Sequence, residues 1–172
     1  MSKHYNVVVI GAGTGGIMTA AQIKNKKSDT SIAIIDPAET HYYQPAWTLV
    51  GAGTYDYDKT GRPMSSVIPK GCDWVKDAVT TIDADNNKVN TASSGELSYD
   101  VLVAAPGIQI DVDGIPGLKE GLEAGVVCSN YTDPKKTWEL VKNFKGGNAI
   151  FTQPTTPIKC GGAPQKIMYL AD

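Results

Sequence analysis

The sequence predicts an α/β fold, a three-layer ββα sandwich with an antiparallel β-meander insertion. Three observations predict it. Residues 5–10 and 32–35 are short β-branched runs, typical of parallel strands that are buried on both faces. A glycine-rich turn and an amphipathic stretch at 17–23 lie between these runs, as in a βαβ unit. From residue 73 to residue 105, β-rich runs alternate with turn residues, which predicts a meander that returns to a buried strand.

The remaining elements follow in chain order. Residues 38–70 are rich in Gly, Pro, Tyr and Thr without a sustained period, so we expect a long irregular excursion. The meander strands are expected at 74–82, 88–91 and 99–105. Asp133 and Pro134 are typical of a helix start, which predicts a helix with Trp138, Val141 and Phe144 on one face.

A second lobe is expected near the C-terminus. A predicted strand at 148–152 leads through a turn to a helix at 163–172. This order is that of a new α/β layer, so we divide the chain into a first domain, 1–145, and the start of a second dinucleotide-type domain, 146–172. We expect the chain to be a fragment or a truncated product.

Composition narrows the function classes. The chain has 172 residues, a net charge of −2 and 41% hydrophobic residues, which gives no basic footprint for nucleic acid. No apolar run approaches the roughly 20 residues of a membrane span, and the absence of a leader pattern makes a cytoplasmic location the expectation. The three cysteines, an odd number, lack CxxC spacing, which argues against a disulfide scaffold and a zinc site.

The glycine-rich turn fits a Rossmann-like dinucleotide site. Gly11-Ala12-Gly13-Thr14-Gly15-Gly16 satisfies GxGxxG directly between a strand and a helix. In this pattern Gly11 permits the tight turn, Gly13 lets the backbone approach a pyrophosphate, and Gly16 lets the helix pack on the strand. Asp36 ends the next strand, where a carboxylate binds ribose hydroxyls. These features do not separate FAD from NAD, but the meander favours FAD.

Two further segments could carry chemistry. Cys160 lies between Lys159 and a Gly-Gly pair at a predicted turn before a helix, where amides and a cation favour a thiolate nucleophile; a buried structural cysteine is the alternative. The loop at 41–45 could bring Gln44 toward a flavin, or could simply expose its aromatic side chains. His41 fits a structural hydrogen-bonding histidine better than a catalytic base.

Several motifs resemble one flavoenzyme family. They are Thr14-Gly15-Gly16, the run HYYQPAWTLVGAG at 41–53, Gly61-Arg62-Pro63, Ser66-Val67-Ile68-Pro69, GNAIFT at 147–152 and TPIKCGGAPQKIMYL at 156–170. Together they resemble the sulfide:quinone oxidoreductases, most closely the type II branch. The resemblance covers essentially the whole chain but only the N-terminal portion of the family's length.

The resemblance implies an enzyme that oxidises sulfide and passes two electrons through FAD to a quinone, with a thiol or sulfite as sulfur acceptor. It places FAD contacts at Thr14, Gly15, Asp36, Gln44 and Val79, and Cys160 at one of two redox cysteines, the one that becomes a persulfide. Gly107 falls in the Ala-Pro-Gly segment where the family has an Ala-Thr-Gly turn under FAD. The partner cysteine, the quinone pocket and a membrane-associating part fall outside this sequence. The implied location is peripheral, on the inner face of the cell membrane, or mitochondrial in eukaryotic relatives.

Two alternatives stay open on the residues. One is a non-catalytic FAD-binding module or a truncated product. The other is a different flavin-dependent disulfide-type oxidoreductase or a type II NADH dehydrogenase. Sulfide-dependent bleaching of bound flavin and NADH-dependent reduction distinguish them.

Overall fold

The computed structural model describes residues 3–153, 155, 158 and 160–172. The described chain forms two compact units. The first comprises Met1–His41 and Arg62–Gln109, and the second comprises Tyr42–Gly61 and Ile110–Asp172. The boundary falls within β3 (Thr40–Tyr42) and β4 (Gly61–Pro63), which pair with each other.

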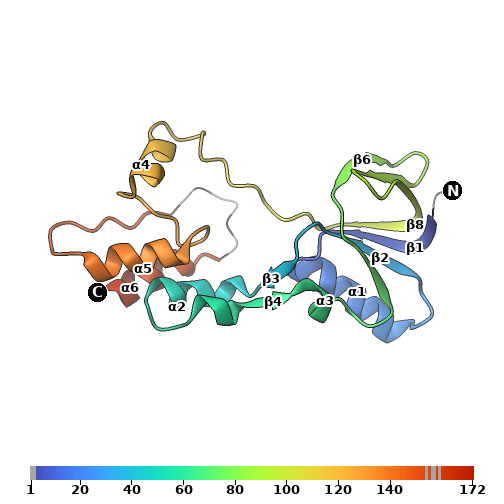
Figure 1. Ribbon diagram of the computed structural model, residues 1–172, viewed down its shortest axis with the longest axis horizontal. Coiled ribbons are helices and arrows are strands. Elements are labelled where there is room, and N and C mark those ends of the chain that lie inside the picture. Colours follow the sequence, from blue (N-terminus) through green and yellow to red (C-terminus); the bar gives the residue numbers. More distant parts are fainter. Residues whose placement is uncertain (1–2, 154, 156–157, 159) are drawn as a thin grey trace. The chain divides into compact units, whose positions relative to one another are not determined.

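The first unit begins with the expected βαβ unit (Figure 1). Strand β1 (Lys3–Ile10) leads into helix α1 (Thr14–Lys26), and β2 (Ile32–Ile35) then pairs with β1 in parallel. All four residues of β2 are buried, as its apolar run predicts. The short helix α3 (Met64–Val67) also belongs to this unit.

The sheet is mixed, with strand order β5-β2-β1-β8-β7-β6. Strand β5 (Cys72–Val75) runs parallel to β2, and β8 (Glu96–Ala104) runs parallel to β1. Strands β6 (Val79–Asp83) and β7 (Lys88–Thr91) complete the meander through antiparallel pairs. The meander is confirmed, but the prediction of one strand over 74–82 is wrong. The chain turns at Asp77, whose backbone N–H donates to Val75 O, and two strands result.

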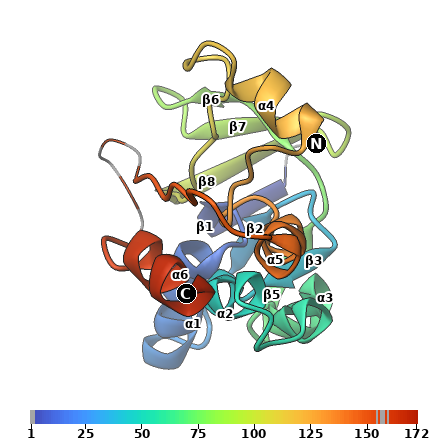
Figure 2. The same cartoon turned by 90° about the vertical axis from the view of Figure 1, so that its left-hand side faces the viewer.

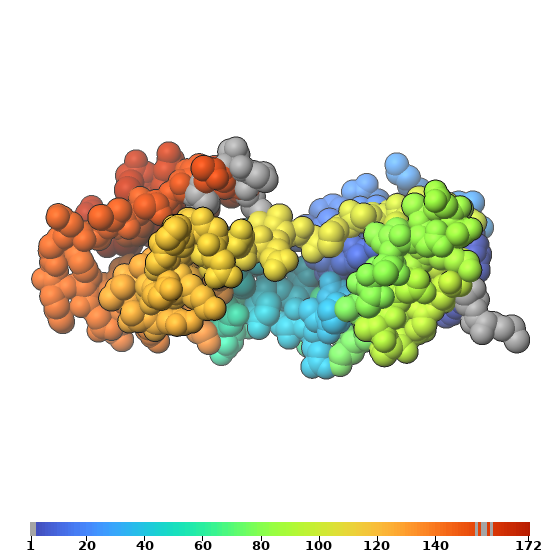
Figure 3. Space-filling model, turned by 90° about the horizontal axis from the view of Figure 1, so that it is seen from above, coloured from blue at the N-terminus to red at the C-terminus, as the bar shows by residue number. Residues whose placement is uncertain are grey.

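Two apolar clusters cover the two faces of this sheet. On one face, Val7, Val9, Ile32 and Ile34 pack with Ala20 of α1. On the other face, a second cluster joins β1 and β2 to the meander strands β7 and β8 of the same sheet. This meander-side cluster contains Tyr5, Val8, Ala33, Ile35, Val89, Leu97 and Tyr99. Figures 1 and 2 show α1 and the β6–β7 hairpin on these opposite faces, and the meander presents a broad continuous surface in Figure 3. The predicted α/β layering is therefore present.

The second unit is mainly helical. It contains 3₁₀ turns at Gln44–Ala46 and Tyr57–Thr60, and helices α2 (Trp47–Gly51), α4 (Leu118–Ala124), α5 (Pro134–Asn143) and α6 (Ala163–Ala171). The expectation of an unpacked excursion at 38–70 is wrong, because α2 packs against α5 and α6 and buries Trp47 and Val50. The Trp47 indole N–H donates to Thr60 Oγ1 at 3.2 Å, which satisfies its polar atom inside this packing.

The C-terminal predictions have mixed outcomes. Helix α5 begins as expected, with Asp133 Oδ1 accepting from the Lys136 backbone N–H at 3.0 Å, and α6 is also confirmed. Phe144 lies beyond the end of α5 and is half-exposed. The predicted strand at 148–152 is not formed. No strand of the described residues pairs with this segment, and Ile150 is 84% exposed. The second-domain assignment of 146–172 stays a prediction.

Candidate dinucleotide site

The glycine turn after β1 leaves no room for larger residues at two positions. Gly11 has φ +95°, and a Cβ there would lie 2.2 Å from the carbonyl oxygen of Ala105. A Cβ on Gly16 would lie 1.9 Å from the oxygen of Gly11. The turn is also tied to the sheet, because Gly11 N–H donates to Ile35 O at 2.9 Å. The tight turn predicted at Gly11 and the close helix–strand packing predicted at Gly16 therefore have a geometric basis.

Gly13 differs from its neighbours because it faces open space. A Cβ built on Gly13 would meet no atom within 4 Å. Gly13 is also the N-cap of α1, and the intrahelical bonds begin with Ile17 N–H donating to Gly13 O at 3.0 Å. The first-turn amides of Thr14, Gly15 and Gly16 precede that bond and have no intrahelical acceptor.

The charge around this helix start suits an anion. In the described chain, α1 has no side-chain cap and no acidic residue in its first turn. Free amides and the positive end of the helix dipole together favour a phosphate at this position. The arrangement can hold the diphosphate of a dinucleotide.

Asp36 lies directly beside the turn. Its Oδ2 accepts from the Ala12 backbone N–H at 2.7 Å, and its Oδ1 accepts from Ala38 N–H at 2.8 Å. A carboxylate has about four acceptor positions, so both oxygens keep capacity for ribose hydroxyls. The sequence pattern did not indicate the hydrogen bond from Ala12. Through this bond Asp36 also holds the glycine turn in place.

Two more side chains reach this region. His41 Nδ1 lies 3.2 Å from the carbonyl oxygen of Ala12, which agrees with a structural hydrogen-bonding histidine. The indole N–H of Trp74 donates to the backbone oxygen of Asp36 at 2.9 Å. Sequence reasoning missed Trp74; the signal available was an indole in a predicted strand, whose N–H needs an acceptor when partly buried.

The three remaining residues expected to contact FAD are Val79, Gly107 and Gln44, and each lies on a different element from the glycine turn. Val79 begins β6 and packs against the meander-side cluster. Gly107 follows β8 with φ +83° and open space around it. Gln44 begins the 3₁₀ turn of the second unit. Their FAD contacts stay predictions.

Cys160 lies before α6, in the second unit. Its side chain is exposed, and its backbone oxygen accepts from Ala163 N–H at 3.3 Å, one residue after the Gly162 N-cap. Lys159, the cation expected beside it, lies outside the described residues. Cys72 and Cys128 are half-buried, and burial raises the pKa of the Cys72 thiol. Cys160 is therefore the described thiol that is most open to solvent.

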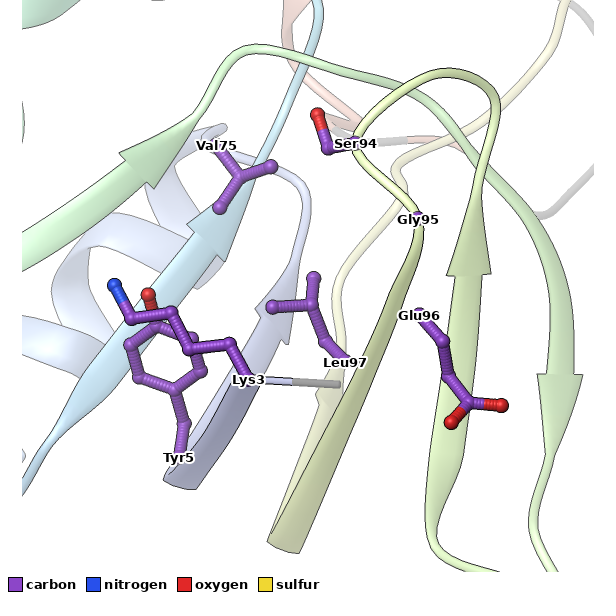
Figure 4. Close-up of a pocket in the computed structure, with 7 residues that line it drawn as sticks. All are labelled: Lys3, Tyr5, Val75, Ser94, Gly95, Glu96 and Leu97. Carbon is purple, nitrogen blue, oxygen red and sulfur yellow. The ribbon is translucent and has the colours of Figure 1, made fainter. Parts of the chain in front are cut away.

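A shallow hollow elsewhere in the first unit does not coincide with the turn (Figure 4). It is lined by Lys3, Tyr5, Val75, Ser94, Gly95, Glu96 and Leu97. Lys3 Nζ and Tyr5 OH both donate to Asp73 Oδ2, and the bond from Lys3, with that from Tyr5, lowers the pKa of Asp73. These groups are occupied in cross-strand contacts at the opposite end of β1 from Gly11.

The described residues contain no cluster of three or more His, Cys, Asp or Glu that could hold a metal ion. Within the same described ranges, every helix is too short or too polar to cross a bilayer.

Comparison with known proteins agrees with this geometry. Residues 5–144 match the family described as pyridine nucleotide-disulphide oxidoreductase. The chain belongs to this family. The match takes in the first unit from Tyr5 onward and the second unit as far as Phe144.

Several relatives of the chain are named sulfide:quinone oxidoreductases. The chain is 47% identical to the mitochondrial sulfide:quinone oxidoreductase of Mus musculus over 172 residues, covering 99% of the chain and 38% of the relative. It is 46% identical to the enzyme of the same name from Dictyostelium discoideum, with 96% and 38% covered. The solved sulfide:quinone oxidoreductase of Aquifex aeolicus superposes with a TM-score of 0.69 at 30% identity, covering 83% of the chain and 33% of that structure. The chain thus spans between one third and two fifths of the length of these relatives.

Proposed function

We propose that this chain is the FAD-binding part of a sulfide:quinone oxidoreductase. The observation that carries the proposal is the glycine turn, in which Gly13 faces open space beside first-turn amides of α1 that have no partner among the described residues. The similarity to named sulfide:quinone oxidoreductases along nearly the whole chain supports the choice of reaction.

The residues of the turn fit FAD. The open side of Gly13 and the amides of Thr14 and Gly15 would hold the diphosphate, and the carboxylate of Asp36 would accept from the ribose hydroxyls. The meander on the far face of the sheet favours FAD over NAD, as the sequence order does. Gln44, Val79 and Gly107 would complete the cofactor contacts.

Bound flavin would supply a two-electron acceptor and donor between sulfide and the quinone. The chain's own contribution is the thiol of Cys160, which is exposed and therefore able to meet a sulfur substrate. As a thiolate it would carry the sulfane sulfur as a persulfide until a thiol or sulfite acceptor takes the sulfur away. The two electrons released when sulfide becomes sulfane sulfur reduce the quinone to the quinol, with two protons from solvent.

The location follows from the proposed substrates. Quinones dissolve in the membrane, so the full-length protein would work at a membrane surface, as a peripheral protein on the inner face of the cell membrane. The relatives from Mus musculus and Dictyostelium discoideum are named as mitochondrial enzymes. This function does not involve nucleic acid, and a net charge of −2 gives the chain no basic surface that would attract it.

The experiment uses the full-length protein that carries this chain. Anaerobic sulfide should bleach the flavin absorbance, and added quinone should restore it. Cys160→Ser should abolish sulfide-dependent quinone reduction while FAD stays bound, whereas the control Cys72→Ala, in the other unit, should keep turnover. Retained turnover in Cys160→Ser would remove Cys160 from the reaction. Bleaching by NADH and not by sulfide would assign the protein to another flavin-dependent oxidoreductase, and no bleaching by either would leave an FAD-binding module.

A further inference from the structure

Two side chains hold two successive peptide groups of the glycine turn. The carboxylate of Asp36 accepts from the N–H of Ala12, which belongs to the peptide group between Gly11 and Ala12. His41 Nδ1 contacts the carbonyl oxygen of Ala12, which belongs to the next peptide group, between Ala12 and Gly13. Ala12 itself is fully buried, so water does not replace either partner.

The proton in the histidine contact can be assigned. A carbonyl oxygen has lone pairs and no hydrogen, so it can only accept. The 3.2 Å contact therefore requires that His41 Nδ1 carries a hydrogen and donates it to Ala12. The imidazole acts here as a donor directed at the turn.

Fixing the Ala12 carbonyl also fixes the Gly13 amide. A trans peptide group is planar, and its N–H points opposite to its C=O. When His41 holds the Ala12 oxygen on one side, the N–H of Gly13 must point to the other. Among the described residues, no acceptor is bonded to this N–H, and the space around Gly13 is open.

We propose that His41 is a positioning residue of the dinucleotide site, which aims the Gly13 N–H at the diphosphate of the cofactor by holding the Ala12 carbonyl. The inference rests on the proposed FAD site and adds a residue to it from outside the GxGxxG motif. Without the donor, the peptide group between Ala12 and Gly13 can rotate, because glycine restricts its backbone least. The buried Ala12 oxygen would also lose its partner.

The test compares two substitutions of nearly equal size in the 172-residue chain. Asn places an amide N–H close to the position of Nδ1, whereas Leu fills the same space without a donor. We expect His41→Leu to raise the FAD dissociation constant about tenfold and His41→Asn to stay within about threefold of wild type, measured by quenching of flavin fluorescence. ADP, which carries the diphosphate, should lose affinity in His41→Leu, and adenosine should not.

The outcomes separate the inference from the proposed function. Equal affinities in all three proteins, equal losses in both variants, or equal losses for ADP and adenosine would each overturn the role of His41. A wild-type full-length protein that binds no FAD would overturn the proposed function instead. The positioning itself can then still be tested, because the ¹⁵N–¹H resonance of Gly13 without ligand should shift in His41→Leu and return toward wild type in His41→Asn. An unmoved resonance in His41→Leu would overturn the inference.

Discussion

The carboxylate of Asp77 accepts a 2.6 Å hydrogen bond from the backbone N–H of Ser94, which joins the turn between β7 and β8 to the segment that separates β5 from β6. The same oxygen accepts from the backbone and the hydroxyl of Ser93, and the other oxygen accepts from Ala78 N–H. Burial of Asp77 works to raise its pKa, but these hydrogen bonds outweigh burial and hold the pKa well below its usual range.

This pKa predicts a stability that depends on acid. A carboxyl group whose pKa is lower in the folded than in the unfolded chain stabilises the fold above the unfolded pKa, about 3.9 for Asp. Its contribution is lost as the pH falls through and below that value. We expect Asp77→Asn to lower the free energy of unfolding at pH 7, and the difference from wild type to shrink toward pH 3 in urea titrations. A difference of the same size at both pH values would contradict this cause.

Asp36 should matter to the cofactor in two ways. Asp36→Ala removes both the acceptor for Ala12 N–H and the proposed ribose acceptor, so we expect FAD affinity to fall about tenfold or more, about 1.4 kcal/mol. Asp36→Asn keeps one side-chain oxygen and should lose less. Flavin fluorescence titration of the three proteins measures the difference. Unchanged affinity in Asp36→Ala would exclude Asp36 from the site.

The thiols of Cys160 and Cys72 should differ in their rate of reaction with iodoacetamide. The thiolate is the attacking form, and burial raises the pKa of the half-buried Cys72, whereas Cys160 is exposed. We expect Cys160 to be alkylated first at pH 7.5, and Cys72 to react several-fold more slowly. Mass spectrometry of digested chain at timed intervals gives both rates. Faster alkylation of Cys72 would contradict a half-buried thiol at this position.

Local patterns explain which features of the fold the sequence predicted. The βαβ unit, the glycine turn and the Asp133 cap depend on residues within a few positions of one another, and all are present. The GxGxxG spacing therefore located the candidate site without any knowledge of tertiary contacts.

The missed features depend on residues far apart in the chain. Helix α2 looked irregular because Trp47 is buried by partners such as Tyr131, whose ring centroid lies 6.5 Å away. The hydrogen bond from His41 to Ala12 joins residues that are 29 positions apart, and no periodic pattern in the sequence predicts it. The single strand expected over 74–82 failed because Asp77 binds a turn 16 residues later. In each case a tertiary partner, invisible in the local pattern, decided the structure.

Gly53 offers a direct test of the packing that sequence reasoning missed. It has φ +70°, and an added Cβ would lie 2.5 Å from ring carbons of Trp138 in α5. Gly53→Ala must strain the backbone and displace a large ring, so we expect a loss of about 2 kcal/mol or more in unfolding free energy. Gly117→Ala in the same unit is the matched control, because Gly117 has φ +82° but no atom within 4 Å of the added Cβ. It should lose only about 1 kcal/mol, the backbone part alone. Urea unfolding followed by tryptophan fluorescence compares the two variants, and equal losses would mean that the ring of Trp138 does not press against this turn in solution.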